Sequence, residues 1–110
     1  MSDITRETEI VKAILKYLKN DLHVFAYKTH GSPYQLIGLP DIIGCHNGRF
    51  FAIEVKSAVG RPTQHQLIVL EQIRNAGGVA GICRSVIEAE QLMAPLVNRP
   101  ALDQPASTAP

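Results

Sequence analysis

Two acidic residues and one lysine in the middle of the chain have the types and spacing needed to cleave a phosphodiester bond. Asp41, Glu54 and Lys56 lie in two short apolar segments separated by Asn47-Gly48. This dipeptide is the strongest short-range signal for a two-residue β-hairpin. Counting back from the turn along both strands places Asp41 opposite Glu54. Because strand side chains alternate between faces, Lys56 projects on the same face as Glu54.

Two carboxylates that face each other across a hairpin repel, since directly opposed residues have Cβ atoms about 4.5–5.5 Å apart. A divalent cation between Asp41 and Glu54 would offset that repulsion, and Mg²⁺ or Mn²⁺ binds oxygen ligands of this kind. The alternative is that both residues flank the hairpin by chance and share a surface salt bridge with Lys56. We favour the metal site, because carboxylates within apolar strands are costly and one lysine neutralises them only in part.

The residues around these three resemble a known nuclease superfamily. Pro40-Asp41, followed after the hairpin turn by Glu54-Val55-Lys56, resembles the signature of the PD-(D/E)XK nucleases. Residues 38–43 and 52–57 also resemble the VRR-NUC family, the virus-type replication and repair nuclease domain, and the similarity covers residues 7–83. The same hairpin is similar to that of archaeal Holliday-junction resolvases. The resemblance implies an α/β, restriction-endonuclease-like fold with an αβββαβ core, in which helices flank a mixed sheet.

The resemblance also implies a role for each residue of the hairpin site. Asp41 and Glu54, together with the backbone carbonyl of Val55, would hold one or two Mg²⁺ or Mn²⁺ ions that activate water and stabilise the charge on the phosphate. Lys56 would either orient and help deprotonate the water or stabilise the pentacovalent phosphate, and both roles stay open. The expected activity is endonucleolytic hydrolysis of DNA, with branched DNA such as a Holliday junction as the expected substrate.

Two residues on predicted helices are further candidates for catalysis. Gln66 resembles a glutamine that the VRR-NUC family carries after its lysine strand, but it also completes an S/T-x-x-E/Q capping box with Thr63. Glu7 resembles the acidic residue that related enzymes place on the first helix, where it would help hold metal or water. It shares a face with the apolar stripe of that helix, whereas the competing Glu9 points nearly opposite. Complementarity to the helix dipole is the alternative role for Glu7.

Contacts to DNA are expected from residues in loops and at strand ends. Lys28, Arg49 and Arg61 could bind phosphates because they flank the proposed site. His30 and Ser32 lie in a loop whose counterpart in the resolvases contributes a small hydroxyl residue. For each of these five residues, a solvated surface charge or ordinary turn chemistry is the alternative, and no base-reading element is evident.

The elements that must position these residues follow from apolar periodicity and from turn and capping signals. Their expected order is helix, three strands, helix, strand, helix. This order packs most simply as one mixed sheet with helices on its faces. The expected ranges are residues 5–19, 24–28, 40–45, 49–56, 63–75, 79–83 and 86–93.

The composition is that of one compact globular domain. Of the 110 residues, 45% are hydrophobic and 19% are charged, which predicts a nuclease-like domain over residues 1–97 and a disordered tail over residues 98–110. The net charge of +1 makes any basic surface local. Cys45 and Cys83 lack metal-like spacing and suit reduced, buried thiols. With no apolar run near the roughly 20 residues of a membrane span and no signal peptide, a bacterial or phage-infected host cytoplasm is expected.

A domain this small offers little surface beyond one catalytic face, so cutting both strands of a duplex or junction requires two active sites. A symmetric homodimer is therefore the expected assembly. Two alternatives remain from the sequence. One is a DNA-binding or assembly module that keeps the nuclease fold without catalysis, and the other is a nuclease that prefers RNA or single strands.

Overall fold

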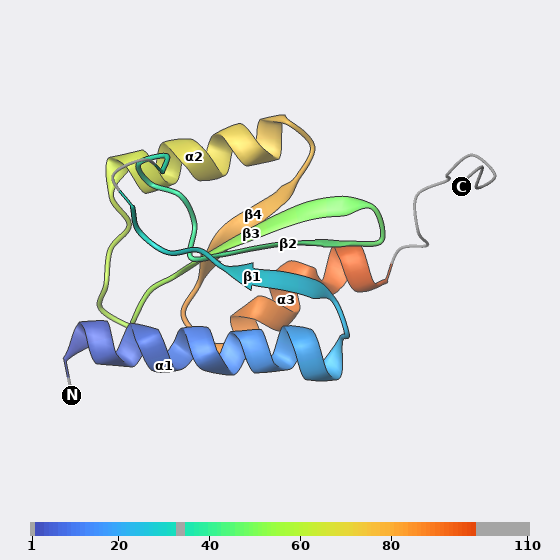
Figure 1. The fold of residues 1–110 in the computed structure, drawn as a ribbon, viewed down its shortest axis with the longest axis horizontal. Coiled ribbons are helices and arrows are strands. Elements are labelled where there is room, and N and C mark those ends of the chain that lie inside the picture. The colour runs from blue at the N-terminus through green and yellow to red at the C-terminus, as the bar shows by residue number, and fades with distance from the viewer. Residues whose placement is uncertain (1, 33–34, 99–110) are drawn as a thin grey trace.

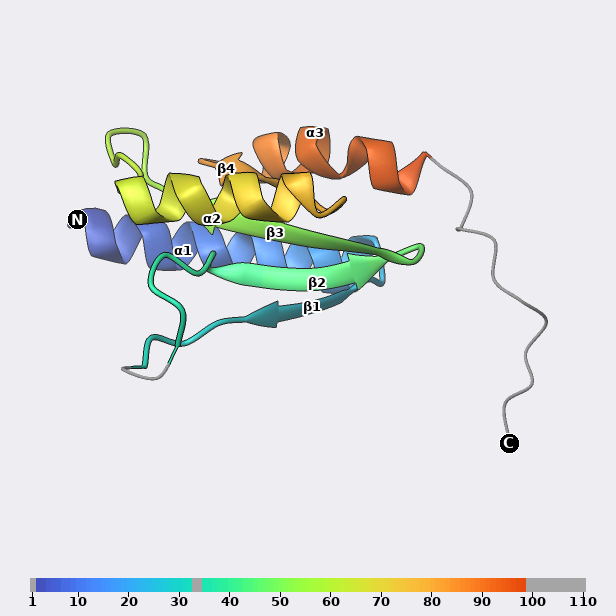
Figure 2. The ribbon, with the colours of Figure 1, turned by 90° about the horizontal axis from the view of Figure 1, so that it is seen from above.

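A computed structural model of the chain describes residues 2–32 and 35–98, which form a four-stranded sheet between helices (Figure 1). The helix α2 lies on one face of the sheet, and α1 and α3 lie on the other, as Figure 1 shows edge-on and Figure 2 shows from above. The αβββαβ order predicted from the sequence is confirmed. The elements are α1 (Asp3–Lys16), the π-helical turn η1 (Tyr17–Asp21), β1 (Phe25–Lys28), β2 (Ile42–His46), β3 (Arg49–Val55), α2 (Gln64–Asn75), β4 (Val79–Cys83) and α3 (Val86–Val97).

The sheet is mixed and has the strand order β1-β2-β3-β4. The first three strands pair antiparallel, whereas β4 pairs parallel to β3 through the crossover that α2 provides. The hairpin of β2 and β3 has the predicted register, which ends with Ile42 opposite Ile53. Positive φ angles of 52° at Asn47 and 79° at Gly48 form its turn, as a type I′ turn requires.

Different apolar side chains bury the two faces of the sheet. On the face of α1 and α3 a large cluster includes Val11, Ile14, Leu18, Ile42, Phe51, Ile53, Val55, Ala89, Met93 and Leu96. On the α2 face a smaller cluster is built from Ala52, Leu70 and Ala80. Side chains alternate along β3, so Glu54 points to the same face as Ala52. The acidic side chain therefore lies on the face with the smaller apolar cluster.

The ends of two helices differ from the prediction. The helix α1 begins at Asp3 rather than residue 5, because the hydroxyl of Ser2 caps it by accepting a hydrogen bond from the Thr5 N–H at 3.2 Å. The helix α3 continues to Val97 rather than residue 93, because Leu96 remains buried in the cluster of its face. In the described part of the chain, no helix is long and apolar enough to cross a bilayer.

Both cysteines are free, but they differ in exposure. Cys83 is buried as predicted, and burial raises the pKa of its thiol to about 12. Cys45 is exposed, so the prediction of a buried thiol is wrong there. It pairs with Phe25 and Phe50 near the hairpin turn, and both of those side chains are themselves exposed.

The tail predicted over residues 98–110 lies outside the described residues, except for Asn98. Asn98 is the C-cap of α3, and its backbone N–H donates to the carbonyl of Ala94 at 2.9 Å.

The close contact of β1 and β2 depends on Gly44. A Cβ at this position would overlap the carbonyl oxygen of Phe25 and come within 2.5 Å of the Phe51 ring. We expect Gly44→Ala to lower the free energy of unfolding by about 3 kcal/mol, measured in urea, because backbone and a buried ring must move. Gly81→Ala is the matched control: its Cβ would meet only the end of the flexible Leu92 side chain, at 3.0 Å. Equal losses in the two variants would contradict this account of the sheet.

Candidate active site

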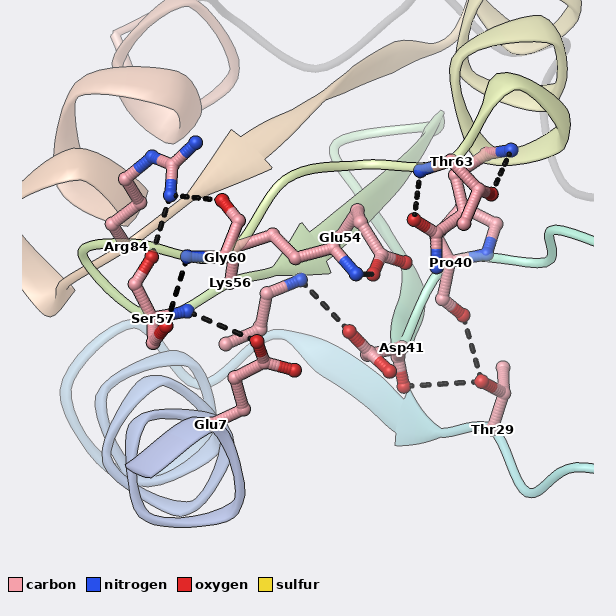
Figure 3. Close-up of polar contacts among 12 residues, drawn as sticks. Glu7, Thr29, Pro40, Asp41, Glu54, Lys56, Ser57, Gly60, Thr63 and Arg84 are labelled. Carbon is pink, nitrogen blue, oxygen red and sulfur yellow. Dashed lines mark hydrogen bonds and ion pairs between the residues drawn. The ribbon is translucent and has the colours of Figure 1, made fainter. Parts of the chain in front are cut away.

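Asp41 and Glu54 lie next to each other beyond the last pair of the β2–β3 ladder. The ladder ends with Ile42 opposite Ile53, so the next residues along the two segments are the two acids. Asp41 precedes β2, and its Oδ2 accepts a hydrogen bond from the Val55 N–H at 2.8 Å (Figure 3). The side chain of Asp41 therefore takes the place of a ladder partner and is fixed directly to β3.

Lys56 lies beside Glu54 just after the end of β3. Its Nζ is 3.4 Å from Glu54 Oε2, and the side chains of Lys56 and Glu54 are only 12% and 3% exposed. The backbone N–H of Lys56 still donates to the carbonyl of Cys83 at 3.2 Å. The predicted arrangement of two neighbouring carboxylates with a lysine on the same face is thus the geometry of the structure.

Burial and charge act together on Glu54. Burial is the larger cause that raises the pKa of this carboxyl, the neighbouring charge of Asp41 is the second, and together they bring it to about 7 although Lys56 acts in the opposite direction. Asp41 is close enough to Glu54 that its negative charge opposes ionisation of the Glu54 carboxyl. A single lysine therefore does not neutralise the pair.

The donor set around Glu54 fits a hard divalent cation. Glu54 Oε1 is buried and has no hydrogen-bond partner among the described residues, and a buried carboxylate oxygen without a partner is costly. Oxygen ligands from carboxylates suit Mg²⁺ or Mn²⁺. Asp41 and Glu54 would hold the ion. Residues 2–32 and 35–98 contain no cluster of three or more His, Cys, Asp or Glu side chains that could bind a metal.

Gln66 lies near Asp41 in the first turn of α2 and also caps that helix. Its Oε1 accepts a hydrogen bond from the Thr63 N–H at 2.8 Å, and Thr63 Oγ1 accepts one from the Gln66 N–H at 3.1 Å. The capping box read from the sequence is therefore present. Gln66 also lines a hollow of about 320 Å³ with Asp41, Lys28 and Ser32, so the structure brings three of the predicted residues together around Asp41.

Thr29 is a residue of the site that the sequence analysis missed. It is buried, its N–H donates to the Asp41 carbonyl at 2.8 Å, and its hydroxyl donates to the Pro40 carbonyl at 2.7 Å (Figure 3). Thr29 thus holds the backbone of Pro40-Asp41 against the end of β1. One signal for Thr29 was available in the sequence. Thr29 directly follows β1, and β1 pairs with β2, the strand that Asp41 precedes.

Two predicted residues have partners outside the carboxylate pair. Glu7 Oε2 accepts a hydrogen bond from the Ser57 N–H at 3.2 Å. Arg49 pairs with His46 at the hairpin turn, five residues and about 17 Å along β3 from Glu54. The structure therefore gives Glu7 a backbone partner and places Arg49 at the far end of the hairpin, and their roles in metal and DNA binding stay predictions.

Of the other predicted DNA contacts, Lys28 ends β1, whereas His30 and Arg61 lie in loops. His30 is exposed and meets the Tyr27 ring edge-on, with 6.4 Å between ring centroids. Arg61 is exposed and, with Arg84, lines a second hollow of about 600 Å³. Lys28 lines the first hollow, and its Nζ donates to the Thr29 carbonyl at 2.8 Å.

The raised pKa of Glu54 makes a prediction about stability without metal. The pKa rises from 4.5 to about 7, so between these values the folded protein binds more protons than the unfolded chain, and stability falls as pH rises. Without divalent ions, we expect Glu54→Gln to be more stable than the wild type at pH 8 by up to about 3 kcal/mol, and the gap to close near pH 4.5. Urea unfolding across this range measures it. A gap that does not depend on pH, or that widens toward acid, would refute the assignment.

Comparison with known proteins supports the fold but not a closer relationship. No family model and no curated protein matches the chain. A solved structure described as a VRR_NUC domain protein is similar with a TM-score of 0.69 and covers 84% of this chain and 88% of that chain, at 15% sequence identity. A likeness at this identity establishes the fold, and the fold implied by the resemblance of residues 7–83 is confirmed. The chain therefore has the fold of a VRR_NUC domain.

Proposed function

We propose that the chain is a metal-dependent endonuclease that hydrolyses phosphodiester bonds in DNA. The observation that carries the proposal is the buried Oε1 of Glu54, which has no hydrogen-bond partner in the described part of the chain and lies beside Asp41. The Lys56 ammonium, 3.4 Å from the other oxygen of Glu54, adds a positive charge on the same face. Two carboxylates and a lysine around an unsatisfied oxygen suit phosphoryl chemistry better than they suit a structural salt bridge.

Asp41 and Glu54 would hold Mg²⁺ or Mn²⁺, which supplies an activated water and neutralises charge on the phosphate. Lys56 would hold the attacking water or donate to a phosphate oxygen, and its place beside Glu54 keeps its ammonium at the metal-binding carboxylates. Val55 fixes Asp41 through its N–H, and its carbonyl is proposed as a further ligand. Gln66 borders the same hollow, where its side-chain oxygen also maintains the start of α2.

The hollow beside Asp41 is the proposed path of the DNA backbone. Lys28 and Ser32 line it, and a lysine and a hydroxyl are both ordinary phosphate contacts that carry no sequence information. Such contacts suit recognition of DNA shape. We therefore infer a preference for branched DNA, with His30 and Arg61 as further contacts, and a homodimer that brings two sites to the two strands.

The proposal is tested with labelled four-way junction, flap, duplex, single-stranded DNA and RNA, in Mg²⁺ or Mn²⁺ and in EDTA. We expect cleavage that requires the metal and is fastest on branched DNA. Asp41→Ala and Lys56→Ala should each lower kcat by at least about 100-fold, because each removes a group that acts on the water or the phosphate. Lys12→Ala, which removes an exposed lysine of α1, is the matched charge control.

Different results would reject different parts of the proposal. Cleavage in EDTA, or full activity of both site variants, would reject the metal-dependent mechanism. Retention of branched DNA without any cleavage would identify a catalytically silent binding module. Faster cleavage of RNA or single strands would keep the chemistry and reject the substrate. Sedimentation of the protein with and without a four-way junction decides whether two copies assemble.

A further inference from the structure

The short turn that follows Lys56, residues 57–60, is held from both sides by charged side chains. Glu7 reaches it from α1, and Arg84 reaches it from the residue after β4 (Figure 3). Neither contact is within an element or between neighbours in sequence, since Glu7 and Ser57 are 50 residues apart and Arg84 and Ser57 are 27 apart. The end of β3 that carries Lys56 is therefore tied to two distant segments.

Arg84 joins the two ends of the turn with one nitrogen. Its Nη1 donates to the carbonyl of Ser57 at 2.5 Å and to the carbonyl of Gly60 at 2.7 Å. The backbone N–H of Arg84 donates to Glu88 Oε1 at 2.8 Å, which fixes Arg84 at the start of α3. Hydrogen bonds from a guanidinium to carbonyls are stronger than neutral ones, so Arg84 is a fixed support for the turn.

Glu7 binds the opposite side of the same residue. Its Oε2 accepts the hydrogen bond of the Ser57 N–H, and Ser57 is only 1% exposed. The Ser57 hydroxyl accepts a hydrogen bond from the Gly60 N–H at 3.0 Å, which closes the turn. A Cβ on Gly60 would come within 2.8 Å of Glu7 Oε2. The glycine therefore leaves the space in which the Glu7 carboxylate lies.

We propose that Glu7 and Arg84 form a clamp on Ser57 that positions Lys56 for catalysis, an inference that rests on the proposed nuclease function. Lys56 lies outside the ladder of β3, and its backbone N–H bonds to Cys83. A lysine side chain is long and flexible, so the position of its ammonium depends on the backbone that carries it. The Glu7 carboxylate on the Ser57 N–H and the Arg84 guanidinium on the Ser57 carbonyl fix the backbone of the residue that directly follows Lys56. Glu7 and Arg84 are positioning residues in this proposal.

The α1 side of the clamp is tested by removing or preserving the acceptor for the Ser57 N–H. Glu7→Ala and Gly60→Ala should each lower kcat about 10- to 100-fold, because a displacement of about 1 Å at a reacting group has effects of this size. Glu7→Gln keeps a side-chain oxygen for Ser57 and should recover most of that loss. A metal ligand behaves differently, since Glu7→Gln would then be as inactive as Glu7→Ala. Glu9→Ala, on an exposed position of the same helix, is the control.

The β4 side is tested with Arg84→Met and Arg84→Lys, since neither keeps a planar guanidinium on both carbonyls. We expect kcat to fall as for Glu7→Ala, while DNA affinity measured in Ca²⁺ and its salt dependence stay unchanged. Arg74→Met is the matched control, because Arg74 also binds a strand carbonyl, that of Ala80 at 2.9 Å, away from Lys56. Arg84 also borders the hollow that contains Arg61. Weaker DNA binding with a salt slope reduced by about 1 and unchanged kcat would instead make it a phosphate contact and overturn the clamp.

Amide hydrogen exchange gives a readout that does not depend on activity. In Glu7→Ala and Arg84→Met, the amides of Lys56, Ser57 and Gly60 should exchange at least about tenfold faster, whereas the Val55 amide, bound to Asp41, should not change. Unchanged exchange at all three positions overturns the clamp. If the wild type cleaves no substrate, the proposed function fails and the positioning role fails with it. If the wild type cleaves DNA and the clamp variants cleave it as fast as the wild type, the clamp fails and the proposed function stands.

Discussion

Glu54 places a carboxylate in a position that is almost closed to water and next to a second carboxylate. This burial of charge opposes folding, and the surrounding structure must offset its free energy. Glu54 is 2% exposed. Its charge lies at the centre of the sheet rather than at its edge, since β3 has β2 on one side and β4 on the other. Burial of a charge without a matched partner opposes folding. The large apolar cluster on the other face of β3 supplies stability that offsets it.

The groups that hold the site in place are mostly backbone groups. Asp41 is fixed by the Val55 N–H and, through its own carbonyl, by Thr29. Ser57 is fixed on both its N–H and its carbonyl. Backbone donors and acceptors are part of the sheet and its continuation, so they move less than free side chains. The two carboxylates and the lysine are thus held by the strand ends that carry them.

Local signals in the sequence were sufficient for the hairpin and the capping box. Asn47-Gly48 determines the turn and therefore the register, and the register places Asp41 and Glu54 together without knowledge of any other part of the chain. Thr63 and Gln66 are likewise neighbours on one helical turn. Thr29, Glu7 and Arg84 could not be assigned in this way. Their partners are backbone groups far along the chain, and no residue type or spacing records which carbonyl a distant arginine will reach.

The hydrogen-bond partner of Glu7 could not be predicted for the same physical reason. An acid on the apolar side of the first helix must point toward the sheet, and the sequence analysis inferred correctly that it faces inward. The helix lies on the face of the sheet opposite α2, however (Figure 1), whereas Glu54 points to the α2 face, as Ala52 does. An acid on α1 can therefore reach the pair only past the end of β3, and there it first meets the free N–H of Ser57. The alternation of side chains along β3 therefore gives Glu7 a backbone partner at the end of this strand.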